Sequence, residues 1–233
     1  RTQYTKKGIH FHLSCRVTHI EGHSVTFTDA ERASHTIEGD KILLSVGRRP
    51  ITRGLGLETL DIELERGGVK VDSQMRTNAE GVYAAGDITG FSLLAHTASR
   101  EAEVAVNTIC GHRDTMLYNA IPGIVYTNPE VAGVGITETQ AKQQGIEYQC
   151  HKLPLAYSGR FVAENESGEG LCKIITDKAT GHILGVHMLG NPCSEIISSA
   201  CIAIERGMTA KELERVVFPH PTVGEIIKET ILM

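Results

Sequence analysis

Apolar and polar residues alternate in the first fifty positions in a way that predicts short β-strands. Residues 9–13 and 24–28 alternate at a period of two, and a turn is expected at 21–23, where Gly22 stands. Residues 41–46 form a nearly continuous apolar run that ends at Gly47, which is typical of a strand buried on both faces. Pro50 then blocks further strand pairing.

The middle of the chain has fewer regular elements. Residues 51–67 are rich in glycine and predict loops, and short strands are expected at 69–71 and 82–85. A helix of about four turns fits residues 96–110, with Gly111 as its stop signal.

From residue 118 onward, strands and helices are interspersed. Thr137 and Thr209 each stand three residues before a Gln or Glu, which is the spacing of a capping box at a helix start. An amphipathic helix is expected at 195–206 before Gly207, and another at 226–232. Strands are expected at residues 121–127, 130–135, 147–153, 171–176 and 182–189. This mixture predicts an α+β domain.

Composition narrows the classes of function. The 233 residues are 41% hydrophobic and 22% charged, as in ordinary globular proteins. The formal net charge of -5 argues against nucleic acid as a partner, and no apolar run is long enough to cross a membrane. The chain begins at Arg1 without an initiator Met or a signal peptide, so we expect it to be cut from a longer, cytoplasmic polypeptide.

The six cysteines suggest a reduced protein without a structural metal. Their spacings are irregular, with no C-x-x-C pair and no zinc pattern, so we expect no metal site and mostly buried, free thiols. His10 and His12 would share one strand face and could chelate a metal, although such pairs are more often solvated.

Two segments in the middle of the chain carry candidate binding chemistry. Residues 77–87 read Thr-Asn-Ala-Glu-Gly-Val-Tyr-Ala-Ala-Gly-Asp, so Asp87 follows a predicted buried strand, where open α/β sheets bind ligands. Residues 93–97, Leu-Leu-Ala-His-Thr, open the predicted helix, whose free N–H groups could stabilise negative charge. Gly-Asp alone is more often a turn, and a lone histidine at a helix start is more often incidental.

A third segment, near the end of the chain, carries candidate acid–base chemistry. Residues 220–225 read His-Pro-Thr-Val-Gly-Glu, and Pro221 suits the first turn of the helix predicted there. His220 would then lie just outside the helix, with Glu225 inside its first turns. A carboxylate at that position can hold one imidazole nitrogen, fix the tautomer and raise the basicity of the ring.

Together these segments resemble the back half of the pyridine nucleotide–disulfide oxidoreductases. Residues 77–87 resemble the family's second flavin-binding signature, which implies that Asp87 hydrogen-bonds the ribityl chain of FAD. Residues 93–97 resemble its Met-Leu-Ala-His segment, which implies that the backbone at Leu94, Ala95 and His96 faces the flavin. Residues 45–50, Ser-Val-Gly-Arg-Arg-Pro, match the return from the NAD domain, which implies that Gly47 lies on the NAD side of that junction.

The resemblance also implies a catalytic pair and a partner subunit. Residues 220–225 match the family's His–Glu pair, in which His220 would be the acid–base for a dithiol on the other subunit of a homodimer and Glu225 its support. Pro219 departs from the small residue that many relatives carry there. The first Rossmann unit and the C-x-x-x-x-C redox pair are absent from the sequence.

Residues 124–138, 185–190 and 194–197 look most like the dihydrolipoyl dehydrogenase branch. The implied reaction oxidises dihydrolipoamide, carried on an acyltransferase or carrier protein, and passes electrons through a disulfide and FAD to NAD+. The expected fold class is α/β plus α+β. The C-terminal end of an NAD-binding domain (1–50) and the central part of an FAD-binding domain (51–117), both Rossmann-like, precede an α+β interface domain (118–233). The alternatives are a non-catalytic dimerisation module and a glutathione- or mercuric-reductase-like enzyme.

Overall fold

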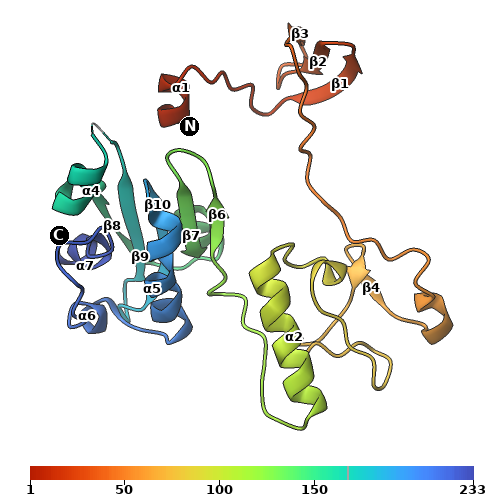
Figure 1. Ribbon diagram of the computed structural model, residues 1–233. Coiled ribbons are helices and arrows are strands. Elements are labelled where there is room, and N and C mark those ends of the chain that lie inside the picture. Colours follow the sequence, from red (N-terminus) through yellow and green to blue (C-terminus); the bar gives the residue numbers. More distant parts are fainter. Residues whose placement is uncertain (167) are drawn as a thin grey trace. The chain divides into compact units, whose positions relative to one another are not determined.

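The fold is described from a computed structural model, in which residues 1–166 and 168–233 are placed (Figure 1). The chain divides into two compact units, Arg1–Arg49 and Pro50–Met233, and each is described by itself.

The first unit is a small three-stranded antiparallel sheet. A short helix, α1 (Thr2–Lys6), precedes the strands β1 (Arg16–Glu21), β2 (Ser24–Thr28) and β3 (Ser34–Glu38), which pair in the order β1-β2-β3. The predicted turn at Gly22 joins β1 to β2. Phe27 is the buried side chain of this sheet, and the rings of His12 and His35 lie 4.9 and 5.4 Å from its ring centroid.

Two strands predicted in this unit do not form. Residues 9–13 and 41–46 carry no strand, and within the placed residues no other segment pairs with them. Leu43 and Val46 are 90% and 84% exposed, although their pattern predicted burial. A doubly buried strand needs neighbouring strands and covering layers, and these placed residues supply neither.

The second unit starts with a sparse region built around one long helix. It holds the 3-10 turns η1 (Leu57–Leu60) and η2 (Asp87–Thr89), the hairpin β4 (Leu64–Glu65) and β5 (Gly68–Val69), and α2 (Ala95–Ile109). Val104 and Ala105 of α2 form a small core with Met75 and Met116. The helix ends as predicted before Gly111, whose φ is +77°.

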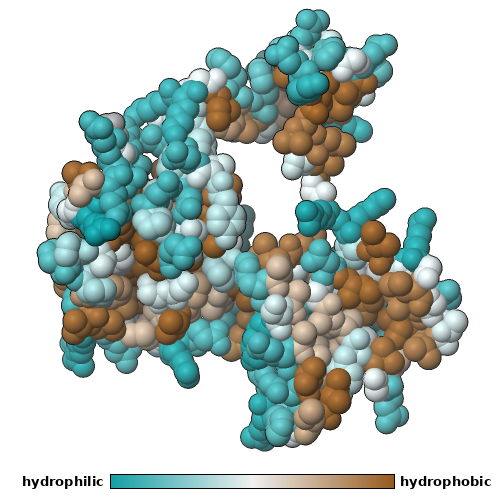
Figure 2. All heavy atoms as spheres, viewed as in Figure 1, coloured by the Kyte–Doolittle hydropathy of each residue, from teal (hydrophilic) through white to brown (hydrophobic). Residues whose placement is uncertain are grey.

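The strand predicted at 82–85 is reduced to one bridge between Arg76 and Tyr83. All strand pairs among the placed residues are antiparallel, so the parallel pairing of a Rossmann sheet is not formed by them. Apolar side chains gather on the surface around η1 and β4 (Figure 2), where Leu55, Leu60 and Leu64 are each about half exposed.

The remainder of the second unit is a five-stranded antiparallel sheet with the order β6-β7-β10-β9-β8. All five predicted strands are present, and their bounds are β6 Gly123–Val125, β7 Val131–Gly135, β8 Tyr148–Pro154, β9 Leu171–Asp177 and β10 Ile183–Leu189. The helical elements are α3 Glu138–Gln143, η3 Leu155–Tyr157, α4 Gly159–Glu164, α5 Cys193–Glu205, α6 Ala210–Leu213 and α7 Ile226–Leu232.

The sheet and its helices enclose the main hydrophobic core. Helix α5 packs on β7 and β10, and α7 packs on β8 and β9. Ile174, Val186, Ile197, Ile226 and Ile227 are buried at their contacts. Both predicted capping boxes are complete, with Thr137 and Gln140 at α3 and Thr209 and Glu212 at α6.

The cysteines are free, but their burial differs from the expectation. Cys172 and Cys193 are buried, Cys15, Cys150 and Cys201 are half-buried, and Cys110 is exposed. In the placed part of the chain, no group of three or more His, Cys, Asp or Glu side chains is arranged to hold a metal. None of the placed helices is long and apolar enough to span a bilayer.

Candidate functional site

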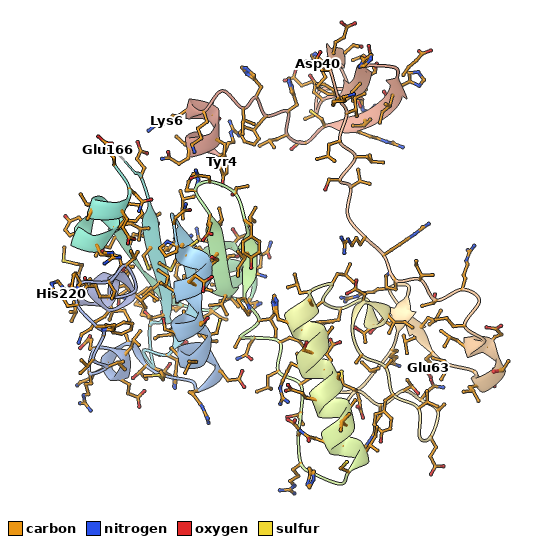
Figure 3. The ribbon with its side chains drawn as sticks, in the orientation of Figure 1. Tyr4, Lys6, Asp40, Glu63, Glu166 and His220 are labelled. Carbon is orange, nitrogen blue, oxygen red and sulfur yellow. The ribbon has the colours of Figure 1, made fainter. Side chains whose placement is uncertain are left out.

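His220 and Glu225 form a close pair at the start of the last helix (Figure 3 labels His220). The imidazole Nδ1 lies 2.9 Å from Glu225 Oε2. Helix α7 begins at Ile226 with Glu225 at its N-cap, so Pro221 is not in its first turn as the sequence suggested. Residues 220–225 instead form bends and a turn that leads into the helix, where the Ile226 N–H donates to the Val223 carbonyl. This segment, the histidine turn, returns the imidazole to the carboxylate.

That turn is held by two hydroxyl groups. Thr222 Oγ1 donates to the Pro219 carbonyl at 2.7 Å, and the buried Ser158 donates to the Thr222 carbonyl at 3.2 Å. Ser158 also caps α4 by accepting from the Phe161 N–H. Helix α4, which the sequence did not predict, therefore supports the histidine turn from the neighbouring layer.

The hydrogen bond between His220 and Glu225 is arranged as in a general acid–base pair. An ionised carboxylate only accepts hydrogen bonds, so the proton sits on Nδ1 and Nε2 is left as the free basic nitrogen. The His220 side chain is 79% exposed while Glu225 is 16% exposed. Within the placed residues, Nε2 has no protein partner, so it is open to an external proton donor.

Asp87 stands at a sharply shaped backbone turn. The preceding Gly86 has φ +84° and ψ −158°, and a Cβ there would lie 3.3 Å from Ala98 of α2. Thr89 donates to the Gly86 carbonyl through both its N–H at 2.9 Å and its hydroxyl at 3.0 Å. The Asp87 side chain is exposed, so its carboxylate can accept hydrogen bonds from a ligand.

The start of α2 follows this turn and leaves its backbone donors free. Leu94 is the N-cap residue, and no side chain caps the helix. Ala95 and His96 are exposed. The His96 side chain turns away to the Pro122 carbonyl, 2.9 Å from Nε2, so the backbone of the first turn and not the imidazole is available to a ligand.

Glu101, which the sequence did not single out, joins the Asp87 turn to α2 through hydrogen bonds. Glu101 of α2 is fully buried, with Oε2 2.6 Å from the Gly86 nitrogen and Oε1 2.7 Å from the Tyr118 hydroxyl. Burial and this carboxylate raise the pKa of Tyr118 above its usual range. The buried stripe of α2 consists of Thr97, Glu101, Val104, Ala105 and Thr108. A charged residue on that stripe was the available sequence signal.

The structure does not bring all the predicted site residues together. Asp87 and the start of α2 share one region, and no hydrogen bond or ion pair of the placed residues links it to His220 and Glu225. Gly47 belongs to the first unit, where it has φ +97° and an exposed backbone.

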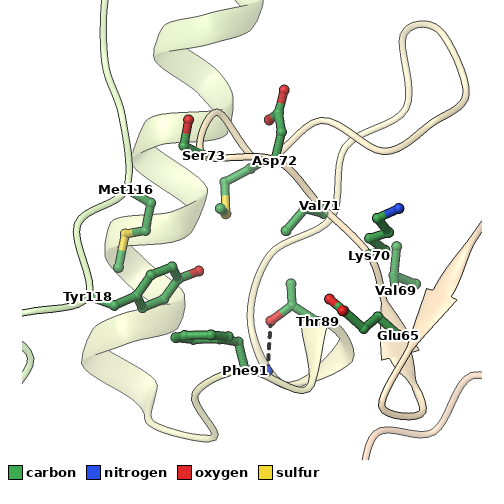
Figure 4. Close-up of a pocket in the computed structure, with 11 residues that line it drawn as sticks. Glu65, Val69, Lys70, Val71, Asp72, Ser73, Thr89, Phe91, Met116 and Tyr118 are labelled. Carbon is green, nitrogen blue, oxygen red and sulfur yellow. Dashed lines mark hydrogen bonds between the residues drawn. The ribbon is translucent and has the colours of Figure 1, made fainter. Parts of the chain in front are cut away.

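A hollow of about 300 Å³ lies beside the Asp87 turn (Figure 4). Its wall includes Thr89 of that turn, Val71 and the paired rings of Phe91 and Tyr118, whose centroids are 4.1 Å apart. Tyr118, whose hydroxyl donates to Glu101, lines this hollow, and no pattern in the sequence predicted it.

Two profiles of one family match the chain in succession. Residues 1–102 match the profile described as pyridine nucleotide-disulphide oxidoreductase, and residues 121–231 match the dimerisation domain of the same family. Together with the antiparallel sheet and its flanking helices, these matches show that the chain belongs to the pyridine nucleotide–disulphide oxidoreductases.

Within that family the chain is similar to dihydrolipoyl dehydrogenases. It is 41% identical to the dihydrolipoyl dehydrogenase of Bacillus subtilis, over 96% of this chain and 48% of the relative. It is 38% identical to the human mitochondrial dihydrolipoyl dehydrogenase, over 97% of this chain and 46% of the relative. The chain therefore spans about half the length of these relatives.

Solved structures of the family share the fold. LpdA from Mycobacterium tuberculosis matches with a TM-score of 0.87 and 29% identity, over 100% of this chain and 51% of LpdA. The HOCl-induced flavoprotein disulfide reductase RclA from Escherichia coli, as its Cu(II) complex, matches with a TM-score of 0.77 and 26% identity. That match covers 93% of this chain and 49% of RclA.

Proposed function

We propose that this chain is the C-terminal half of an FAD-dependent dihydrolipoyl dehydrogenase that oxidises dihydrolipoamide with NAD+. The observation that carries the proposal is the exposed His220 imidazole, oriented by Glu225 at 2.9 Å. The similarity to dihydrolipoyl dehydrogenases over nearly the whole chain supports the same reaction.

The domain assignment belongs to this proposal. Residues 1–50 would end an NAD-binding domain, 51–117 would form the centre of an FAD-binding domain, and 118–233 would be the interface domain of a homodimer. The division of the chain after Arg49 and the dimerisation-domain match at 121–231 support these limits.

The region around Asp87 has features that fit a flavin nucleotide. The glycine at position 86 lets the backbone pass close to α2, the Asp87 carboxylate is exposed, and the first turn of α2 presents uncapped N–H groups. Asp87 would bind the hydroxyl chain of FAD, and the backbone at Leu94, Ala95 and His96 would face the ring system. Gly47 would lie on the NAD side. When bound, FAD would supply the two-electron relay between the dithiol and NAD+.

His220 would manage the protons of the dithiol. A thiol reacts rapidly only as the thiolate, so a base must take its proton. Nε2 would accept that proton, and the imidazolium that forms would be stabilised by the Glu225 carboxylate through Nδ1. The family resemblance implies that this dithiol reacts with a cysteine pair of the partner subunit. Nε2 would therefore have to be exposed on this subunit to reach it.

The test compares this chain with the longer polypeptide, the parent, in which the proposal places it. The parent should purify with equimolar flavin absorbance and reduce NAD+ with dihydrolipoamide. The isolated 233 residues should do neither, because the pyrophosphate cradle and the cysteine pair are not among them. A parent that used a reduced nicotinamide nucleotide to reduce glutathione disulfide or mercuric ion, in preference to oxidising dihydrolipoamide with NAD+, would favour the related reductases instead. A parent without flavin would favour the dimerisation module.

A further inference from the structure

Glu101 is a buried carboxylate on a helix face that otherwise packs like a core. Its side chain has no exposed surface, and its neighbours on the stripe include Val104 and Ala105. Among the placed residues, no cation forms an ion pair with it. Burying a charge costs free energy, and an apolar residue at such a position is often neutral or stabilising. A contribution to stability therefore does not explain this residue.

The hydrogen bonds of Glu101 indicate its task. Each carboxylate oxygen faces a donor, the Gly86 N–H at 2.6 Å and the Tyr118 O–H at 2.7 Å. The Gly86 N–H can only donate, so Oε2 is held as its acceptor, at a distance that is short for an N–H···O hydrogen bond.

The two sides of Gly86 are then fixed separately. Its N–H is held by Glu101, and its carbonyl is held by Thr89. Because Gly86 has φ +84°, a conformation that few residues adopt, its two peptide planes need such restraint. The second plane leads directly into Asp87, so the direction of the Asp87 side chain depends on both bonds.

We propose that Glu101 is a positioning residue for the Asp87 turn and that it links this turn to Tyr118, where the chain enters the dimerisation domain. This inference rests on the proposed function for the identity of the ligand at Asp87. Glu101 itself does not touch the ligand. It acts by holding the Gly86 amide, while Tyr118 holds the carboxylate from the opposite side.

The first experiment measures amide exchange of Gly86 by NMR in the 233-residue chain. Glu101→Leu removes the acceptor and should speed exchange of the Gly86 N–H by about tenfold or more, because a buried donor is then left without its hydrogen bond. Glu101→Gln should stay close to wild type, because its carbonyl can still accept from Gly86 while its amide donates to the Tyr118 oxygen. If Glu101→Leu does not fold, Glu101→Asp, which is too short to reach both donors, takes its place.

The second experiment measures the dissociation constant for FAD in the parent by flavin fluorescence. Glu101→Leu should raise it about tenfold or more and Glu101→Gln should restore it, since the acceptor is regained. Val104→Ala is the matched control, because Val104 lies on the same buried stripe and its loss should lower the melting temperature without touching the turn.

The outcomes separate the two proposals. The role of Glu101 would be overturned if Glu101→Leu left the Gly86 exchange rate unchanged. It would also be overturned if Val104→Ala, at an equal loss of melting temperature, changed the exchange rate and the FAD dissociation constant as much as Glu101→Leu does. If Glu101→Gln failed to restore both readouts, that would overturn it as well. If the wild-type parent bound no FAD, the proposed function would fail, and the exchange measurement would still decide whether Glu101 positions the turn.

Discussion

At the scale of single residues, the useful chemistry depends on what each side chain has as a neighbour. The same residue type serves in two ways here, because the His96 imidazole is engaged by a carbonyl while the His220 imidazole keeps one nitrogen free. The two glutamates likewise differ, since Glu225 supports an exposed ring and Glu101 holds a backbone amide in the interior.

Removing the His220 base should slow dithiol oxidation in the parent. We expect His220→Gln to lower dihydrolipoamide turnover by about 10²–10⁴-fold, the usual worth of general acid–base catalysis. Glu225→Gln should be milder, because it keeps an acceptor for Nδ1 but loses the charge that stabilises the imidazolium. Steady-state kinetics would measure both effects, and the flavin content of each variant is the control. Wild-type turnover in His220→Gln would rule out the acid–base role.

The thiols should react in an order set by exposure. Burial raises the pKa of Cys193 and of Cys201 to about 11, and that of the buried Cys172 to about 12. Few thiolates therefore exist at these positions near pH 8, and only the thiolate reacts. We expect iodoacetamide to label the exposed Cys110 first, and Cys172 and Cys193 only after unfolding, as read by mass spectrometry. Cys110→Ser should abolish the fast phase. Rapid labelling of Cys172 in the folded chain would contradict this order.

At the scale of elements, helix α2 carries much of the candidate binding region. Its outer face contacts the following loop through Arg100, whose two terminal guanidinium nitrogens donate to Asp114. Asn107 also contacts this loop, and its amide lies 2.8 Å from the same carboxylate. The Arg100 and Asn107 hydrogen bonds hold the pKa of Asp114 well below its usual range. This loop leads to Met116 and Tyr118, so its anchoring supports the small core and the Glu101 contact.

The Asp114 contact should give a pH-dependent contribution to stability. A depressed carboxylate pKa in the folded state stabilises the fold above the unfolded value of about 3.9 and loses that effect as the pH falls through the folded pKa. Asp114→Asn should therefore lower the urea midpoint at pH 7, and the difference from wild type should shrink below about pH 4. Glu103→Gln is the control, because its contact with Arg100 is long and exposed. An equal difference at pH 7 and pH 3 would argue against the ionic contribution.

At the scale of the whole molecule, the dimerisation-domain match predicts self-association. Ile197, Ala200 and Ile204 form the buried face of α5, whereas Ile202 on the same helix is 62% exposed. Helix α5 belongs to the domain that we expect to form the dimer, and an exposed apolar residue on it would gain by burial in a large obligate interface.

We expect the 233-residue chain to sediment as a dimer at micromolar concentration. Ile202→Glu should shift it toward monomer with little change in melting temperature. Val162→Glu, a similar change at an exposed position on α4, should leave the dimer intact. Sedimentation of wild type as a monomer alone would contradict the prediction.

The sequence by itself determined the elements whose signals are local. The capping boxes at Thr137 and Thr209, the glycine stop after α2 and the helix 226–232 could be predicted because the groups that satisfy each other lie within a few residues. The five strands of the last domain were also predictable, since their partners all lie in the same stretch of chain. The family followed from motifs that are contiguous in the sequence.

Tertiary structure alone decided the features that join distant residues. The apolar run 41–46 predicted a buried strand, yet a strand forms only when a neighbour offers backbone groups, and none of the placed residues does so. The turn that returns His220 to Glu225 needed Ser158, which is 62 positions before His220 in the sequence. The roles of Glu101 and Tyr118 appeared only when folding brought them to Gly86, because a hydrogen bond depends on positions in space and not on spacing along the chain.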